Sequence, residues 1–239
     1  EKNIQSGAPS DAFIWPEYLT LKTNGYYGYI MKLRPANYFE FGNFLLAKKN
    51  FKSFDAMLAA AMKICDGFMM LHRFGFSYQD LNDGNFFIDP ATGDVLICDN
   101  DNVMPQGEKS GIMGKARYMA PEVVAGGIPD KNGDRVSLSV ILFMLFFANH
   151  PFEGAKVVAC PCMTEKFEKK FYGSEALFIY DPTDKTNLQV SLISIIHKID
   201  IVFIEIKIEN SRVLFTPLYT SWITEEHEHR IFNMFLDIV

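Results

Sequence analysis

Apolar residues in the segment 53–73 recur with the period of an α-helix. Met57, Ala61, Cys65 and Phe68 fall three or four positions apart, which places them on one helix face. Ser53 is a suitable N-cap, and Gly75 is suited to the position that ends a helix. The pattern therefore predicts a helix over 53–73 that packs against a core.

Residues 11–33 have the pattern of two strands joined by a turn. A short apolar run at 13–15 is ended by Pro16, and an aromatic, β-favouring segment covers 26–33. Asn24 and Gly25 between them form one of the strongest turn signals in protein sequences.

Two shorter apolar runs, at 86–88 and 95–98, flank the turn residues of 90–94 and predict a β-hairpin. A polar stretch over 99–120 then predicts a loop. The apolar run over 136–148 is too short for a membrane span, which needs about 20 residues, and predicts a buried helix.

The last quarter of the chain has a different composition. Residues 204–208 alternate strictly between apolar and charged residues, as a strand does, and eight of the eighteen residues in 191–208 are isoleucine. Two explanations stay open. The chain carries a β insertion here, or its reading frame has shifted near Leu188.

The overall composition allows a sizeable hydrophobic core, and its acidic balance favours solubility. Of the 239 residues, 49% are hydrophobic and the net charge is −6, with basic residues scattered along the chain. This argues against a nucleic-acid-binding surface. The chain begins at Glu1 without a start methionine, which indicates a piece of a longer protein.

Four cysteines do not form a recognisable metal site. Only Cys160 and Cys162 are close in sequence, and no second pair or histidine cluster accompanies them. Reduced thiols are the simpler interpretation, and they fit a cytoplasmic protein without a membrane anchor.

The most informative residues lie between the predicted helix and the predicted hairpin. Asp80 is followed by Leu81 and, five residues after the aspartate, by Asn85. Asp99 follows the second hairpin strand, and residues 118–122 read Tyr-Met-Ala-Pro-Glu. Aspartate and asparagine are common in turns, so each motif alone is weak. Their order and spacing together are strong.

These motifs resemble those of the protein kinase family: the H-R-D-L-x-x-x-N catalytic loop, the D-F-G aspartate and the A-P-E end of the activation segment. The resemblance covers about residues 10–155. Within the family, the sequence is most similar to a bacterial Ser/Thr branch. It implies an α+β fold, mainly a helical C-lobe with a remnant of the N-lobe sheet. The expected domains are the end of the N-lobe at 1–34, the C-lobe at 35–185 and an atypical segment at 186–239.

The resemblance also implies the site residues. Asp80 is expected to orient the acceptor hydroxyl and take its proton, while Asn85 and Asp99 are expected to hold Mg²⁺. Met31 is expected to be the gatekeeper, followed by a hinge whose backbone meets the adenine of ATP. The positions that match this role are Met31, Lys32 and Arg34.

Several residues depart from the family pattern. Tyr78 and Gln79 replace the histidine and arginine of H-R-D, which argues against a phosphorylation switch, and Asn100 replaces the phenylalanine of D-F-G. Asn82 stands where a catalytic-loop lysine is usual, and Lys115 where a threonine is usual. The hypothesis is that Lys115 supplies the missing cation near the transferred phosphate; the alternative is a solvated loop lysine.

The chain contains no G-x-G-x-x-G loop and no V-A-I-K lysine before residue 13, and both act on the phosphates of ATP. Glu1 falls near the expected helix glutamate, with an ordinary charged helix end as the alternative. The chain alone is therefore expected to bind ATP weakly and to transfer phosphate poorly.

Three functions remain open at this point. The first is an ATP- and Mg²⁺-dependent Ser/Thr protein kinase that acts on a protein substrate. The second is a pseudokinase that serves as a binding or scaffolding module, favoured by Gln79, Asn82 and Asn100. The third is a small-molecule phosphotransferase, which the tidy A-P-E segment argues against.

Overall fold

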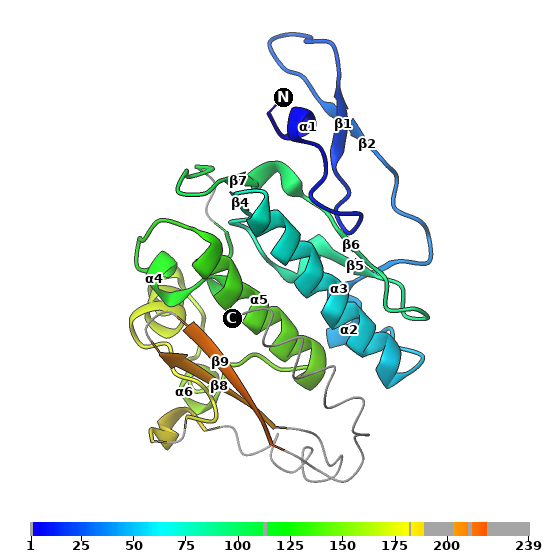
Figure 1. The fold of residues 1–239 in the computed structure, drawn as a ribbon. Coiled ribbons are helices and arrows are strands. Elements are labelled where there is room, and N and C mark those ends of the chain that lie inside the picture. The colour runs from blue at the N-terminus through cyan, green and yellow to red at the C-terminus, as the bar shows by residue number, and fades with distance from the viewer. Residues whose placement is uncertain (1, 112–113, 182, 189–202, 210–211, 219–239) are drawn as a thin grey trace. The chain divides into compact units, whose positions relative to one another are not determined.

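A computed structural model describes residues 2–111, 114–181, 183–188, 203–209 and 212–218 (Figure 1). The chain divides into two compact units. The first holds residues 1–114 and 128–134, and the second holds 115–127 and the described residues from 135 onward. Each unit is described by itself.

The first unit begins with α1 (Lys2–Ser6) and the antiparallel pair of β1 (Pro16–Leu19) and β2 (Tyr29–Met31). This confirms the two strands, with Asn24 and Gly25 at positive φ in the turn. The prediction was wrong about Pro16, which begins β1 and does not end a strand. Proline lacks an N–H, so it is tolerated as the first residue of a strand.

The run at 13–15 joins a different part of the unit. Phe13 forms a parallel bridge with Ile97, and the Ile14 N–H donates to the Ile97 carbonyl at 2.9 Å. The predicted hairpin is confirmed, and it forms a three-stranded sheet in the order β3–β5–β6. Its strands are β3 (Phe39–Glu40), β5 (Phe86–Ile88) and β6 (Val95–Ile97).

The predicted helix is confirmed as α3 (Phe54–Arg73), which follows the short α2 (Phe41–Leu45). The Ser53 side chain accepts a hydrogen bond from the Ala56 N–H at 3.1 Å, as an N-cap does. Gly75 adopts a φ of 82° just beyond the C-cap. That left-handed conformation costs a glycine little, so the helix ends there.

The prediction of a loop over 99–120 was wrong in part. β7 (Met104–Pro105) pairs with β4 (Phe76–Ser77), which follows α3 directly. Two 3₁₀ turns, η1 (Asp83–Asn85) and η2 (Asn100–Asn102), flank the β5–β6 hairpin. In Figure 1, β4 and β7 lie side by side next to α3.

The second unit is mainly helical. Its largest element is α5 (Lys131–Phe147), whose first four residues belong to the first unit. Every residue of 136–145 is buried, which confirms the predicted core helix. The other helical elements are η3 (Ala116–Tyr118), α4 (Pro121–Val124), α6 (Ala155–Val158), α7 (Glu165–Lys169), η4 (Lys170–Ser174) and η5 (Lys185–Asn187).

The last described residues form an antiparallel pair of strands, β8 (Phe203–Glu209) and β9 (Arg212–Leu218). The strand predicted from the alternation at 204–208 is therefore confirmed. Most of the isoleucine-rich stretch, 189–202, lies outside the described residues, as does Glu1. Both explanations for the unusual composition stay open.

The fold is α+β, with helices and small antiparallel sheets. Among the helices that the structure describes, none combines the length and apolar character required to cross a membrane.

Candidate active site

A buried carboxylate holds the backbone of the catalytic loop. Asp134, in the first turn of α5, is 3% exposed. Its Oδ2 accepts the Tyr78 N–H at 2.8 Å, and its Oδ1 accepts the Gln79 N–H at 3.2 Å. The His72 Nε2 lies 3.0 Å from Oδ2. A carboxylate bound by several N–H groups is a strong anchor, so this pairing fixes the backbone just before Asp80.

Tyr78 connects the catalytic loop to the residues around Asp99. Its fully buried ring lies 5.5 Å from that of Phe68 in α3. Its hydroxyl donates to the Cys98 carbonyl and lies 3.2 Å from the Asp99 carbonyl. Burial raises the pKa of Tyr78 well above its ordinary value, and nearby carboxylates raise it further, so the phenol stays protonated and remains a donor.

Three asparagine carboxamides surround Asp80. The Asn82 Nδ2 lies 3.3 Å from Asp80 Oδ1, and the Asn102 Nδ2 lies 3.4 Å from Asp80 Oδ2. The Asn85 Nδ2 donates to the Asp80 backbone carbonyl at 2.8 Å. The Asn82 and Asn102 contacts orient the carboxylate without neutralising its charge, as a general base requires, and the Asn85 contact holds the backbone.

The hairpin pairs Asn85 with Cys98, the residue before Asp99. The Asn85 carbonyl accepts the Cys98 N–H at 2.9 Å. Asp99 has a left-handed backbone, with a φ of 57°, and its exposed carboxylate does not cap the following turn. A left-handed aspartate is uncommon and often marks a functional position.

The donor chemistry at this end of the hairpin fits Mg²⁺. Carboxylate and carboxamide oxygens are the ligands that this hard cation prefers. Asn102 adds a buried Oδ1 atom that has no hydrogen-bond partner among the described residues, although its side chain is only 4% exposed. A buried oxygen without a partner, on a side chain that also contacts Asp80, fits a site built for a cation or a donor.

Asn100, at the position of the D-F-G phenylalanine, is 3% exposed. Its Nδ2 donates to the Ile14 carbonyl at 2.6 Å and to the Ile97 carbonyl at 3.4 Å, but its Oδ1 has no partner within the described part of the chain. The side chain therefore finds half of the partners that a buried asparagine needs. It ties η2 to the segment before β1.

The predicted hinge residues occupy different surroundings. Met31 ends β2, and Lys32 is exposed with an ion pair to Glu17 at 3.7 Å. The Arg34 guanidinium lies 4.4 Å above the ring of Phe87, the second residue of β5. The structure thus brings Arg34 to the strand that follows Asn85. The expected contact of the hinge with adenine stays a prediction.

Gly114 approaches the catalytic loop closely. A Cβ atom at this position would lie 3.0 Å from the Gln79 carbonyl and 3.2 Å from Asp80 Oδ1. Any side chain here would therefore displace one of these groups. Lys115, the next residue, belongs to the second unit, so its role as a replacement cation stays a prediction.

The first unit has two cavities. One, of about 930 Å³, is lined by Asn100, Tyr29 and Met104 among others. The second, of about 880 Å³, is lined by Lys32 and Leu96 among others. Asp80, Asn85 and Asp99 line neither cavity.

Within the second unit, Arg117 forms a bidentate ion pair with Glu153, with distances of 2.5 Å (Nε to Oε1) and 2.9 Å (Nη2 to Oε2). The Tyr172 hydroxyl also donates to this carboxylate, at 2.6 Å. The pairing lowers the pKa of Glu153 against the opposing effect of its burial. The ion pair thus connects η3, just before the Ala-Pro-Glu residues 120–122, to Glu153.

Sequence reasoning missed several contributors to the site. The contacts of Asp134 were not predicted, although a single carboxylate before a long apolar run is an available signal. Asn102 and Phe87 gave no such signal, because neither belongs to a motif. Their roles depend on contacts across the hairpin.

The comparisons identify the family. The model of the protein kinase domain matches residues 28–199, well over half of the chain. The chain therefore belongs to the protein kinase family, and its α+β fold is that of a protein-kinase-like domain.

Individual relatives are more distant. "Protein kinase C delta type" from Mus musculus is 27% identical over 158 residues, which cover 64% of this chain and 23% of the relative. "Probable serine/threonine-protein kinase PknB" from Bifidobacterium longum is 28% identical over 95 residues, covering 37% and 14%. "Protein kinase C-like 1" from Candida albicans is 30% identical over 98 residues, covering 39% and 9%.

The chain thus spans less than a quarter of the length of these relatives. They include bacterial and eukaryotic proteins, so the expected bacterial branch stays a prediction.

Proposed function

We propose that the intact protein transfers a phosphoryl group from ATP to serine or threonine hydroxyls of a protein substrate. The observation that supports this most directly is the convergence of Asp80, Asn85 and Asp99. The Asn85 amide contacts the Asp80 carbonyl, and the Asn85 carbonyl accepts the N–H of the residue before Asp99. Phosphoryl transfer depends on such positioning more than on covalent chemistry.

Each residue has a defined part in this proposal. Asp80 orients the acceptor hydroxyl and takes its proton, while the asparagine contacts hold its carboxylate in place. Asn85 and Asp99 hold Mg²⁺, which neutralises phosphate charge when bound. Met31 is the gatekeeper, and the backbone at Lys32 and Arg34 meets the adenine. Lys115 supplies a cation near the transferred phosphate.

We also propose that residues 1–34 are the end of an N-lobe, that 35–185 form the C-lobe and that 186–239 are an atypical segment. The chain contains no glycine-rich phosphate loop. Turnover is therefore expected in the intact protein, in the cytoplasm, and not in this chain alone.

The test is a phosphate-transfer assay on the full-length protein, with radiolabelled ATP, Mg²⁺ and a generic protein substrate. Asp99→Ala and Asp80→Asn are each expected to lower turnover by at least about 100-fold, because each removes a metal ligand or the base. Asp66→Asn is the matched control, since Asp66 is an exposed carboxylate on α3. Equal activity of wild type and Asp99→Ala would contradict the proposal.

A pseudokinase is the second candidate. It is favoured by Asn100, whose buried Oδ1 lacks a partner in the described structure, and by the absence of arginine at Gln79. Nucleotide-dependent stabilisation of the intact protein without phosphate transfer would support this function over catalysis.

A further inference from the structure

The carboxamide of Gln79 binds the backbone of the segment that follows β7. Its Nε2 donates to the Glu108 carbonyl at 2.6 Å and to the Ser77 Oγ at 3.0 Å. Its Oε1 accepts the Ser110 N–H at 3.1 Å. The side chain is buried, with 7% of the residue exposed. One amide therefore makes both a donor and an acceptor contact to backbone groups two residues apart, as a neighbouring strand would.

These contacts begin where backbone pairing ends. β7 pairs with β4 through Phe76 and Pro105 and through Ser77 and Met104, and the Gln106 N–H donates to the Gly75 carbonyl at 2.8 Å. Beyond Gln106, the chain turns away at Gly107, which has a φ of 86°. Figure 1 shows β4 beside β7 at this point. The Gln79 side chain thus extends the attachment by two more groups.

The backbone of Gln79 is itself tightly fixed. Its φ is 67°, a left-handed conformation that is uncommon and strained for glutamine. The buried Asp134 accepts its N–H. Such a conformation persists only when its surroundings enforce it. Asp80 is the next residue, so the segment at 108–110 and the candidate base share one rigid connection.

We propose that Gln79 is a positioning residue whose carboxamide fastens the backbone at Glu108 and Ser110 to the catalytic loop, next to Asp80, without any charged or phosphorylated partner. The proposal rests on the proposed function for its catalytic meaning. The attachment itself is measurable without ATP or turnover. Failure of one is therefore distinguishable from failure of the other.

Because the Gln79 amide is neutral, its attachment to the segment does not depend on phosphorylation. It recognises a carbonyl and an N–H of the main chain, and neither changes when a hydroxyl of the segment is modified. A lysine or arginine side chain has donors only, so it could bind the Glu108 carbonyl but could not accept the Ser110 N–H. The segment is accordingly held in its position whether or not Ser110 carries a phosphate.

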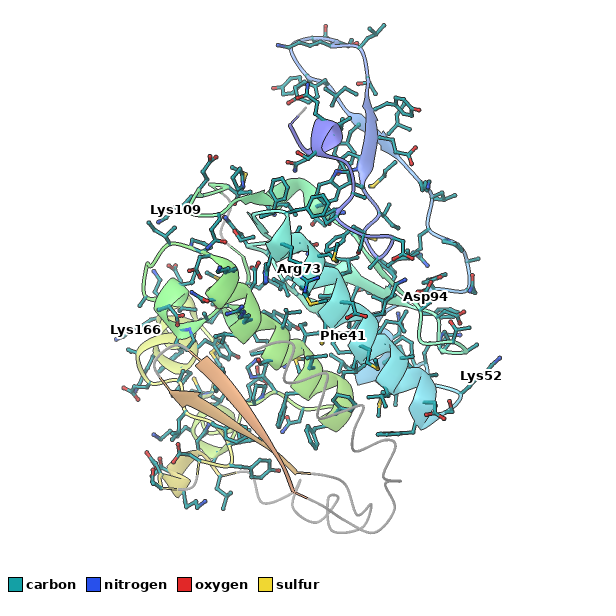
Figure 2. All side chains as sticks on the ribbon, viewed as in Figure 1. Phe41, Lys52, Arg73, Asp94, Lys109 and Lys166 are labelled. Carbon is teal, nitrogen blue, oxygen red and sulfur yellow. The ribbon has the colours of Figure 1, made fainter. Side chains whose placement is uncertain are left out.

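The first test uses trypsin on the full 239-residue chain. Lys109 lies between the two attached residues, on the exposed loop labelled in Figure 2. Gln79→Met keeps the side-chain length but removes the hydrogen bonds. It is expected to speed cleavage after Lys109 roughly tenfold, because local opening becomes easier. Cleavage after Lys52 and Lys166, exposed or partly exposed lysines also labelled in Figure 2, is expected to be unchanged.

Gln106→Met is the matched control, since Gln106 is an exposed glutamine in the same segment. Its Oε1 accepts the backbone N–H of Lys131 at 3.3 Å. It is expected to leave cleavage after Lys109 within about twofold of wild type. Unchanged cleavage in Gln79→Met, or equal acceleration at all three lysines, would overturn the proposal.

The second test measures hydrogen exchange at the Ser110 amide of the unsubstituted chain, so that it does not depend on any variant folding. The Ser110 N–H donates to the Gln79 Oε1 at 3.1 Å, and its exchange therefore reports directly on this attachment.

After correction for intrinsic exchange, the Ser110 amide of the unsubstituted chain is expected to be protected roughly tenfold or more, at pH 5 as at pH 7.5, because a neutral amide holds it. If the Ser110 amide exchanges at its intrinsic rate, Gln79 does not position the segment.

Discussion

At the scale of single residues, the β5–β6 hairpin depends on Gly93. The glycine has a φ of 75°, and a Cβ atom there would lie 2.0 Å from the Ala56 carbonyl oxygen of α3. The turn therefore packs its backbone directly against the helix. The hairpin carries Asn85 and Asp99 at its ends, so this contact also helps to position the candidate site.

Gly93→Ala is expected to destabilise the protein by more than about 2 kcal/mol, because backbone strain and a steric clash add together. Gly107→Ala is the control. Its φ of 86° is equally unfavourable for alanine, but nothing lies within 4 Å of the added Cβ. It is expected to cost about 1 kcal/mol. The free energies of unfolding in urea measure both, and equal losses would contradict the steric explanation.

At the scale of elements, the end of α5 is connected to η3 by a buried histidine. The Nε2 of His150 lies 2.7 Å from the Arg117 carbonyl, and its Nδ1 accepts the Phe152 N–H at 3.1 Å. Since Nδ1 is an acceptor, the single proton of the neutral ring sits on Nε2. Complete burial lowers the pKa of His150 from 6.5 to about 4.

This pKa predicts a stability loss in acid. A histidine that folds in its neutral form stabilises the protein fully above its unfolded pKa of about 6.5, and this contribution is lost as the pH falls towards 4. A pKa difference of one corresponds to about 1.4 kcal/mol, so the full loss is about 3 kcal/mol. Urea unfolding between pH 7 and pH 4 should show a weaker pH dependence in His150→Gln than in wild type. An unchanged slope would contradict the assignment.

At the scale of the whole molecule, the match to the protein kinase domain spans residues of both units. Nucleotide binding is therefore a property to test on the whole chain. The hinge, Asn85 and Asp99 all belong to the first unit, but Lys115 and the A-P-E segment belong to the second. Phosphoryl transfer as proposed uses residues of both units, so it must be measured on a chain that contains both.

MgATP is expected to stabilise the chain weakly. For a dissociation constant of about 1 mM, 10 mM MgATP contributes about 1.4 kcal/mol, which raises the melting temperature by roughly 3–6 °C for a chain of this size. Asp99→Ala should lose this shift, whereas the exposed control Asp66→Asn should keep it. A shift that survives in Asp99→Ala would mean that the nucleotide does not use this carboxylate.

The strand β7 is a part of the fold that local sequence leaves open. The loop predicted over 99–120 contains β7. The strand was missed because Met104 and Pro105 show neither alternation nor β-branched residues. Their strand exists only through pairing with β4, which lies almost thirty residues earlier. Short strands of this kind are produced by tertiary contacts and have no local pattern.

The sequence by itself determined the helix at 53–73, the hairpin, the buried helix and the order of Asp80, Asn85 and Asp99, because hydrophobic period, turn chemistry and motif spacing act between near neighbours. Only the tertiary structure decided the contacts of Asp134 and Gln79. Asp134 reaches the Tyr78 N–H across 56 positions, and Gln79 reaches Ser110 across 31. Hydrogen bonds between such distant residues depend on how the whole unit folds, and no local pattern encodes them.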